Sequence, residues 1–176
     1  MKRFGAKAVC AGMLAAAVLF GGCGKGEAAE EAAAIEEKNQ VDGAIEAKEA
    51  KPVKEIYEEI AQSVELYSPV EMADSFISNY YGIDPEKLEE YVFVMSEEAT
   101  SAETIVIMKV KDEGDIEKIS SALQVVVDEK KGEMEDYLPE QFEIVDKSSV
   151  KSKGNYVYLV ISESKDAIEK IIEEGI

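Results

Sequence analysis

The sequence predicts an α+β domain, in which an antiparallel four-stranded sheet built from two hairpins carries helices packed on one face. Three observations favour this class. Apolar residues recur at helical spacings of three and four in several segments. Two pairs of short runs are rich in β-branched and aromatic residues and bounded by turn-forming residues. The strands come as neighbouring pairs and not singly between helices, which is typical of antiparallel sheets.

One or two helices are expected before the sheet. Residues 52–65 begin with a proline, a favourable first helical residue, and repeat apolar side chains along one face. A second helix is predicted over residues 69–81 and ends at Gly82, because glycine tolerates the left-handed conformation found after many helices. Asp84 and the proline after it are then expected to begin a short helical turn.

The first hairpin is predicted from residues 91–95 and 103–110, and a long amphipathic helix follows it to about Met134. The acidic residues at 112–115 resemble a capping box at the start of this helix. Clustered carboxylates are also calcium ligands, but the segment lacks the spacing of an EF-hand loop. Helix capping is therefore the preferred interpretation.

The second hairpin is predicted from residues 141–150 and 156–161, with turn-forming residues around Gly154 between them. Ser164 is placed to cap a last amphipathic helix. The domain is therefore predicted to span residues 52–176.

The amino-terminal segment predicts export and lipid attachment. Three basic residues precede a 13-residue apolar run, Ala8 to Phe20, which is the length of a signal peptide and too short to span a bilayer. Small residues then precede Cys23, in a pattern that resembles a bacterial lipobox, although Leu19 lies one position earlier than is commonest. We expect a signal peptide at residues 1–22 and a diacylglyceryl group on Cys23, with a further acyl chain such as palmitate, as the membrane anchor.

Residues 23–51 consist of this cysteine and a segment dominated by alanine and glutamate. With almost no large apolar side chains, the segment cannot bury a core. We expect an acidic linker, either coil or transient helix, that holds the domain away from the membrane surface.

Composition excludes several kinds of function. The chain has 176 residues, a formal net charge of −19 and no histidine, and its two cysteines, Cys10 and Cys23, both precede the predicted domain. A Ser-His-Asp triad, a cysteine nucleophile and a thiolate or histidine metal site are therefore excluded from that domain. The acidity and the lack of a basic cluster argue against nucleic-acid binding.

Two kinds of side chain are candidates for a site. Carboxylate pairs at residues 89–90 and 97–98 are of the kind that acid/base chemistry uses, but such pairs arise by chance in an acidic chain. Tyrosines at positions 80–81, and Tyr156 with Tyr158, can form an exposed aromatic surface. Tyr156 and Tyr158 share one face of the last strand with Val160, and if helices cover the other face, these tyrosines line the open one.

Four segments together resemble the domain of unknown function family 4358. They are Ala102-Glu103-Thr104-Ile105-Val106-Ile107, the Lys-Val-Lys-Asp that follows it, Tyr137-Leu138-Pro139-Glu140-Gln141, and Lys153-Gly154-Asn155-Tyr156-Val157. The resemblance covers most of residues 66–165. It implies a lipoprotein of Gram-positive bacteria, and it implies no activity and no catalytic residues.

The expected function is that of a membrane-anchored, extracytoplasmic lipoprotein whose domain is a non-enzymatic binding or interaction module. Its partner is expected to be an envelope protein or a small ligand at the outer face of the cytoplasmic membrane. A carboxylate-based extracellular hydrolase and an inert structural spacer are the alternatives. No catalytic residue, cofactor or metal site is predicted.

Overall fold

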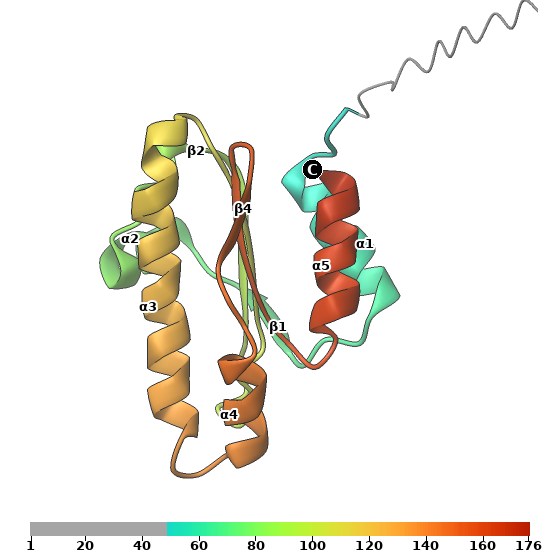
Figure 1. The fold of residues 1–176 in the computed structure, drawn as a ribbon, viewed down its shortest axis with the longest axis vertical. Helices are drawn as coiled ribbons and strands as arrows, with labels where there is room; N and C mark the ends of the chain where they lie inside the picture. The colour runs from blue at the N-terminus through green and yellow to red at the C-terminus, as the bar shows by residue number, and fades with distance from the viewer. Residues whose placement is uncertain (1–48) are drawn as a thin grey trace, which may run out of the picture. The chain divides into compact units, whose positions relative to one another are not determined.

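The computed structural model describes residues 49–176, and five strands in this part of the chain form one antiparallel sheet (Figure 1). The strands follow the order β1-β2-β3-β5-β4 across the sheet. Their bounds are β1 Pro69–Glu71, β2 Leu88–Ser96, β3 Thr104–Val110, β4 Lys151–Lys153 and β5 Tyr156–Ile161. The antiparallel sheet is confirmed, with five strands in place of the four that we predicted.

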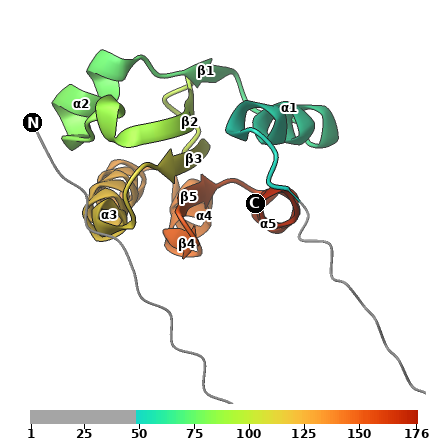
Figure 2. The same cartoon turned by 90° about the horizontal axis from the view of Figure 1, so that it is seen from above.

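Helices cover both faces of the sheet and not one, which corrects the predicted arrangement. In Figures 1 and 2, α1 (Val53–Ser63) and α5 (Lys165–Gly175) lie on one face. On the other face lie α2 (Asp74–Tyr81), α3 (Ile116–Met134) and α4 (Pro139–Asp146). The reason is visible in β5, whose six residues are all buried, so that neither of its faces meets water.

Each face has its own hydrophobic core. Beneath α1 and α5, side chains of β2, β3 and β5 pack against residues that include Ile56, Ile60, Ile168 and Ile172. On the opposite face, Phe93, Leu159 and Ile161 belong to the core that α3 covers. The alternation predicted for the last strand is therefore confirmed, with the tyrosines on one side and Val157, Leu159 and Ile161 on the other.

One predicted strand and the start of the second predicted helix are wrong, although that helix is present as α2 and ends at Gly82 as predicted. Residues 141–150 do not form a strand, because most of them belong to α4, which begins at Pro139 and buries Val145. Leu138, Phe142 and Val145 are spaced by four and three, so they share a helix face. Residues 69–71 form the edge strand β1 and not the start of a helix, and the proline suits an edge because it lacks an N–H group.

The predicted cap at Asp84 is confirmed, and the capping box at residues 112–115 is confirmed only in its first half, because Asp112 caps a 3₁₀ turn while Asp115 pairs with Lys87. Asp84 accepts a hydrogen bond from the N–H of Glu86 at 3.0 Å at the start of the 3₁₀ helix η1 (Pro85–Lys87). Asp112 does the same for Gly114 at 2.8 Å in η2 (Glu113–Asp115), which leads directly into α3.

The described chain begins and ends in the same layer. The N–H of Lys51, just before α1, donates to the carbonyl oxygen of Gly175 in α5 at 2.8 Å. The N–H of Val53 donates to Glu90 of β2 at 2.7 Å, so a carboxylate from the sheet binds the positive end of α1. The attachment point of the preceding segment therefore lies on the α1/α5 face.

The predicted signal peptide, the lipidated Cys23 and the acidic linker up to residue 48 lie outside the described residues. Within residues 49–176, no helix has the length and apolar character needed to cross a bilayer.

Candidate functional site

Tyr156 and Tyr158 do not form a partner surface, because α1 and α5 cover the face that we expected to be open. Their side chains are 6% and 3% exposed. The hydroxyl of Tyr158 donates to Glu173 of α5 at 3.0 Å, and burial, followed by this bond, raises the pKa of Tyr158. The ammonium of Lys109 lies 5.8 Å from the ring centre of Tyr156. Both tyrosines therefore join the sheet to its covering layer.

The other tyrosine pair lies in a different environment. Tyr80 of α2 is 71% exposed, while Tyr81 is partly buried and stacks on Phe93 with ring centres 5.7 Å apart. Phe76 lies between them, 4.8 Å from Tyr80 and 5.8 Å from Tyr81. These contacts fix the three rings of α2 against the sheet and leave Tyr80 open to solvent.

A groove of about 670 Å³ lies between α2 and α3, and we call it the α2–α3 groove. The sheet and α2 contribute Phe76, Tyr80, Tyr81 and Met95. Helix α3 contributes Glu129, Lys130, Gly132 and Glu133. A volume of this size is within the range of pockets that hold small ligands or side chains of a partner.

The charges of the groove come from α3. Glu129 and Glu133 are one helical turn apart and are both exposed. Lys130 pairs with Glu133 at 2.8 Å, whereas Glu129 forms no ion pair with any described residue. Burial, followed by the nearby carboxylate of Glu129, raises the pKa of Tyr81, so its hydroxyl stays protonated and available to Glu129.

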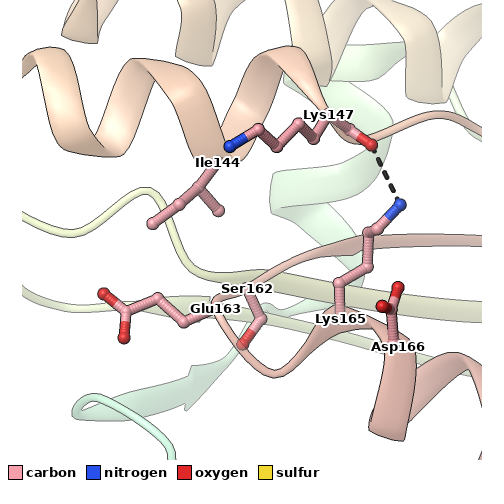
Figure 3. Close-up of a pocket in the computed structure, with 6 residues that line it drawn as sticks. All are labelled: Ile144, Lys147, Ser162, Glu163, Lys165 and Asp166. Carbon is pink, nitrogen blue, oxygen red and sulfur yellow. Dashed lines mark hydrogen bonds between the residues drawn. The ribbon is translucent and has the colours of Figure 1, made fainter.

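A second hollow of about 300 Å³ lies at one end of the sheet, and its lining is shown in Figure 3. Lys165, at the start of α5, donates to the carbonyl oxygen of Lys147 at 2.9 Å (Figure 3). Lys147, Glu163 and Asp166 also line this hollow. Its lining carries equal numbers of lysines and carboxylates, so it has no clear preference for a ligand of either charge.

Glu103 lies beside this hollow and is 9% exposed. One of its oxygens accepts a hydrogen bond from the N–H of Tyr67 at 2.6 Å, and the other accepts one from the hydroxyl of Ser162 at 2.7 Å. The space around it is about 10 Å³, which is enough for one water molecule. Glu103 thus joins three chain segments and has no room for a substrate.

The geometry can now be compared with known proteins. A family model described as a domain of unknown function (DUF4358) matches residues 62–162. The chain belongs to the DUF4358 family. Comparison with curated proteins and with solved structures finds no match. The DUF4358 match includes the whole α2–α3 groove and all five strands, whereas α5 and most of α1 lie outside it.

The segments that resemble DUF4358 have structural roles here. Gln141 accepts a hydrogen bond from the N–H of Ala102 at 2.9 Å and so joins α4 to the loop before β3. Gly154 has a φ of +56° in the turn between β4 and β5. The side chain of Asn155 donates to the carbonyl oxygen of Val110 at 3.2 Å. Tyr137, in contrast, is 85% exposed.

The carboxylate pairs singled out in the sequence do not converge on a site. Glu89 pairs with Lys109 at 3.0 Å, and the Glu90 beside it binds the start of α1. Glu98 accepts a hydrogen bond from Ser68 at 2.9 Å. Within the described part of the chain, no group of three or more acidic or other ligating side chains is placed to hold a metal ion.

Sequence reasoning included the tyrosines at 80–81 but missed the rest of the groove. Glu129 and Glu133 lie on the charged side of an amphipathic helix, which is usually solvated, and Met95 is the last apolar residue of strand β2. One signal for the groove was available in the sequence, namely Gly132 in the middle of a helical pattern. A glycine there has no side chain, so it leaves room between its helix and a neighbouring one.

Proposed function

We propose that the protein is an extracytoplasmic lipoprotein, held at the cytoplasmic membrane through Cys23, whose domain is a non-enzymatic binding module. The sequence of residues 1–23 supports the anchor, because a basic start, a short apolar run and small residues before a cysteine are what lipid attachment requires. The α2–α3 groove supports the binding role.

The position of the groove is the observation that carries this proposal. The chain enters the domain at Lys51, which is hydrogen-bonded to α5, while the helices that line the groove, α2 and α3, lie on the opposite face of the sheet from α1 and α5 (Figure 2). The proposed tether therefore joins the domain on the face that does not bear the α2–α3 groove. Tyr80, 71% exposed at this groove, is available to a partner from the surroundings.

A binding role agrees better with the carboxylates than hydrolysis does. A carboxylate hydrolase needs two carboxyl groups facing a cavity that admits the substrate. Glu103 accepts bonds from Tyr67 and Ser162 beside a space of about 10 Å³. The exposed Glu163 lines the same small space, which leaves a substrate no place between these two carboxylates. Glu129 and Glu133 in the groove, and Glu163 and Asp166 in the larger hollow, do face cavities, but all four are exposed, whereas a carboxyl group becomes a general acid when burial raises its pKa.

The anchor is tested by Cys23→Ala in cells grown with radiolabelled palmitate. We expect the wild-type chain to carry the label and to sediment with membranes, and the variant to lose both properties, since the thiol is the acceptor of the lipid. A variant that stays equally membrane-bound contradicts the anchor.

The binding role is tested by placing a photo-crosslinking phenylalanine analogue at position 80 in intact cells. The same analogue at position 137 is the control, because Tyr80 and Tyr137 are both exposed tyrosines and Tyr137 lies outside the groove. We expect a discrete crosslinked product from position 80 and none from position 137. Identical products, or none at all, contradict the proposal.

A further inference from the structure

The charged residues of the groove are two carboxylates, Glu129 and Glu133, and one lysine, Lys130, so its lining is negative on balance. Three aromatic rings, Phe76, Tyr80 and Tyr81, present surfaces whose π-electrons attract cations. Facing them, α3 places Glu129 and Glu133 on one side of the helix. A cation bound here contacts ring faces and carboxylates together.

Among residues 49–176, no lysine or arginine forms an ion pair with Glu129. Lys130 pairs with Glu133 at 2.8 Å, while Glu129 interacts with the neutral hydroxyl of Tyr81. Because Lys130 already pairs with Glu133, Glu129 is the carboxylate with which a ligand cation can pair, and a ligand anion would be repelled by it.

The net charge of the whole chain also favours a cationic ligand over an anionic one. Its net charge of −19 attracts cations over distances near the Debye length and repels phosphates and acidic peptides. A groove of about 670 Å³ is also larger than one ammonium or guanidinium group needs, so it has room for several side chains.

Building on the binding role proposed above, we propose that the α2–α3 groove binds a lysine- or arginine-bearing segment of a partner protein. The aliphatic part of such a side chain packs on the rings of Phe76 and Tyr80, and its charged end pairs with Glu129. Helices α2 and α3, which line the groove, lie on the face of the sheet opposite α1 and α5 (Figure 2), so the segment would bind on the face opposite the one where the chain enters the domain.

The experiment uses the full chain in neutral detergent micelles at 0.15 M salt. The probes are two fluorescently labelled hexapeptides, one of alternating lysine and glycine, the other with glutamine replacing lysine. Binding is followed by fluorescence anisotropy and by the shift of the Gly132 amide resonance, since Gly132 lies in the groove. Free lysine amide is a third probe that separates a peptide segment from a small cation.

We expect the lysine peptide to bind and to shift the Gly132 resonance, and the glutamine peptide to bind at least tenfold more weakly. Glu129→Gln and Tyr80→Ala should each weaken binding about threefold to tenfold, as expected for one ion pair or cation–π contact. Glu117→Gln and Tyr137→Ala are the matched controls, with the same charge or ring removed outside the groove. They should weaken binding less than twofold.

The outcomes separate the two proposals. If Glu117→Gln weakens binding as much as Glu129→Gln, the attraction is general and the inference is overturned. If the glutamine peptide binds as tightly as the lysine peptide and Tyr80→Ala weakens both, the groove binds peptides but not through charge, so the inference fails and the binding role stands. If lysine amide binds as tightly as the peptide, the ligand is a small cation and not a protein segment, so the inference is overturned. If Tyr80→Ala weakens the binding of none of the probes, and position 80 gives no crosslink in cells, both proposals fail.

Discussion

The two faces of the sheet differ in how completely helices cover them. On the α1/α5 face, Ile56, Ile60, Ile168 and Ile172 are fully buried. Lys151 pairs with Glu169 at 2.8 Å at the edge of this layer. On the opposite face, α2 buries Ile77 fully but leaves Tyr80 71% exposed beside a groove of about 670 Å³.

If the proposed binding role is right, one face of the sheet mainly stabilises the fold and the other mainly binds the partner. Side chains that are fully buried on folding contribute most of the hydrophobic stabilisation, while an exposed ring contributes little to folding and is free to contact a partner. The closed face is the one through which the chain enters, and the open one bears the groove. The following substitutions test this division.

The largest expected effect is from a core substitution on the closed face. Ile168→Ala should lower the free energy of unfolding by about 2–5 kcal/mol, because it leaves a cavity between α5 and the sheet. Tyr80→Ala on the open face should cost about 1 kcal/mol or less. Urea denaturation followed by circular dichroism measures both. If Tyr80→Ala is as destabilising as Ile168→Ala, Tyr80 is a core residue and the division between the faces fails.

An intermediate effect is expected at Glu103, at the end of the sheet between the two layers. Glu103→Ala leaves the N–H of Tyr67 and the hydroxyl of Ser162 without their acceptor, so we expect a loss of about 2 kcal/mol or more. Glu97→Ala, which removes an exposed carboxylate nearby in sequence, should change stability by less than about 0.5 kcal/mol. Thermal denaturation of both variants checks this, and equal stabilities would show that Glu103 is not structural.

The smallest effect is expected at Tyr158. Tyr158→Phe removes the bond to Glu173 and should cost on the order of 1 kcal/mol at pH 7. Because the pKa of Tyr158 is raised in the folded state, the unfolded chain releases the phenolic proton first as pH rises through about 10. The stabilisation that Tyr158 gives the folded state is therefore fully present below about pH 10. It decreases as the pH rises from there towards the pKa of Tyr158 in the folded state.

The gap between the wild-type chain and Tyr158→Phe should accordingly narrow above pH 10, as measured by urea denaturation from pH 7 to pH 11. Tyr137→Phe, which removes a hydroxyl from an 85% exposed side chain, is the control and should match the wild-type chain at pH 7. A gap that is constant across this range contradicts the pKa assignment.

The sequence predicted the antiparallel sheet, the long α3 and the last helix, because their patterns extend over many residues. It did not predict the second covered face. The evidence for two covered faces lies in Tyr156–Ile161, which is apolar on both faces. A tyrosine fits a buried face as well as an exposed one, so the strand alone does not decide whether the face with Tyr156 and Tyr158 is covered. Helices α1 and α5 are far apart in sequence, so no local pattern shows that they pack on the same face.

Short elements were predicted least well, for physical reasons. Three residues of β1 are too few to show alternation, and their pairing with β2 depends on tertiary contacts. In α4, Phe142, Ile144 and Val145 fit a loose strand pattern as well as a helix, and Pro139 at the first helical position was the deciding signal. The groove depends on the separation of α2 and α3, which no local pattern specifies.

The hydrogen bond between Lys51 and Gly175 brings the two ends of the domain together. Adjacent ends allow a domain to be rejoined there and opened elsewhere, giving a circular permutant with the same core. The turn between α3 and α4, where Tyr137 is exposed, is a suitable new opening. A tether attached at that turn would hold the domain by its groove-bearing layer, so the direction in which this fold presents its groove is set by where the chain is cut.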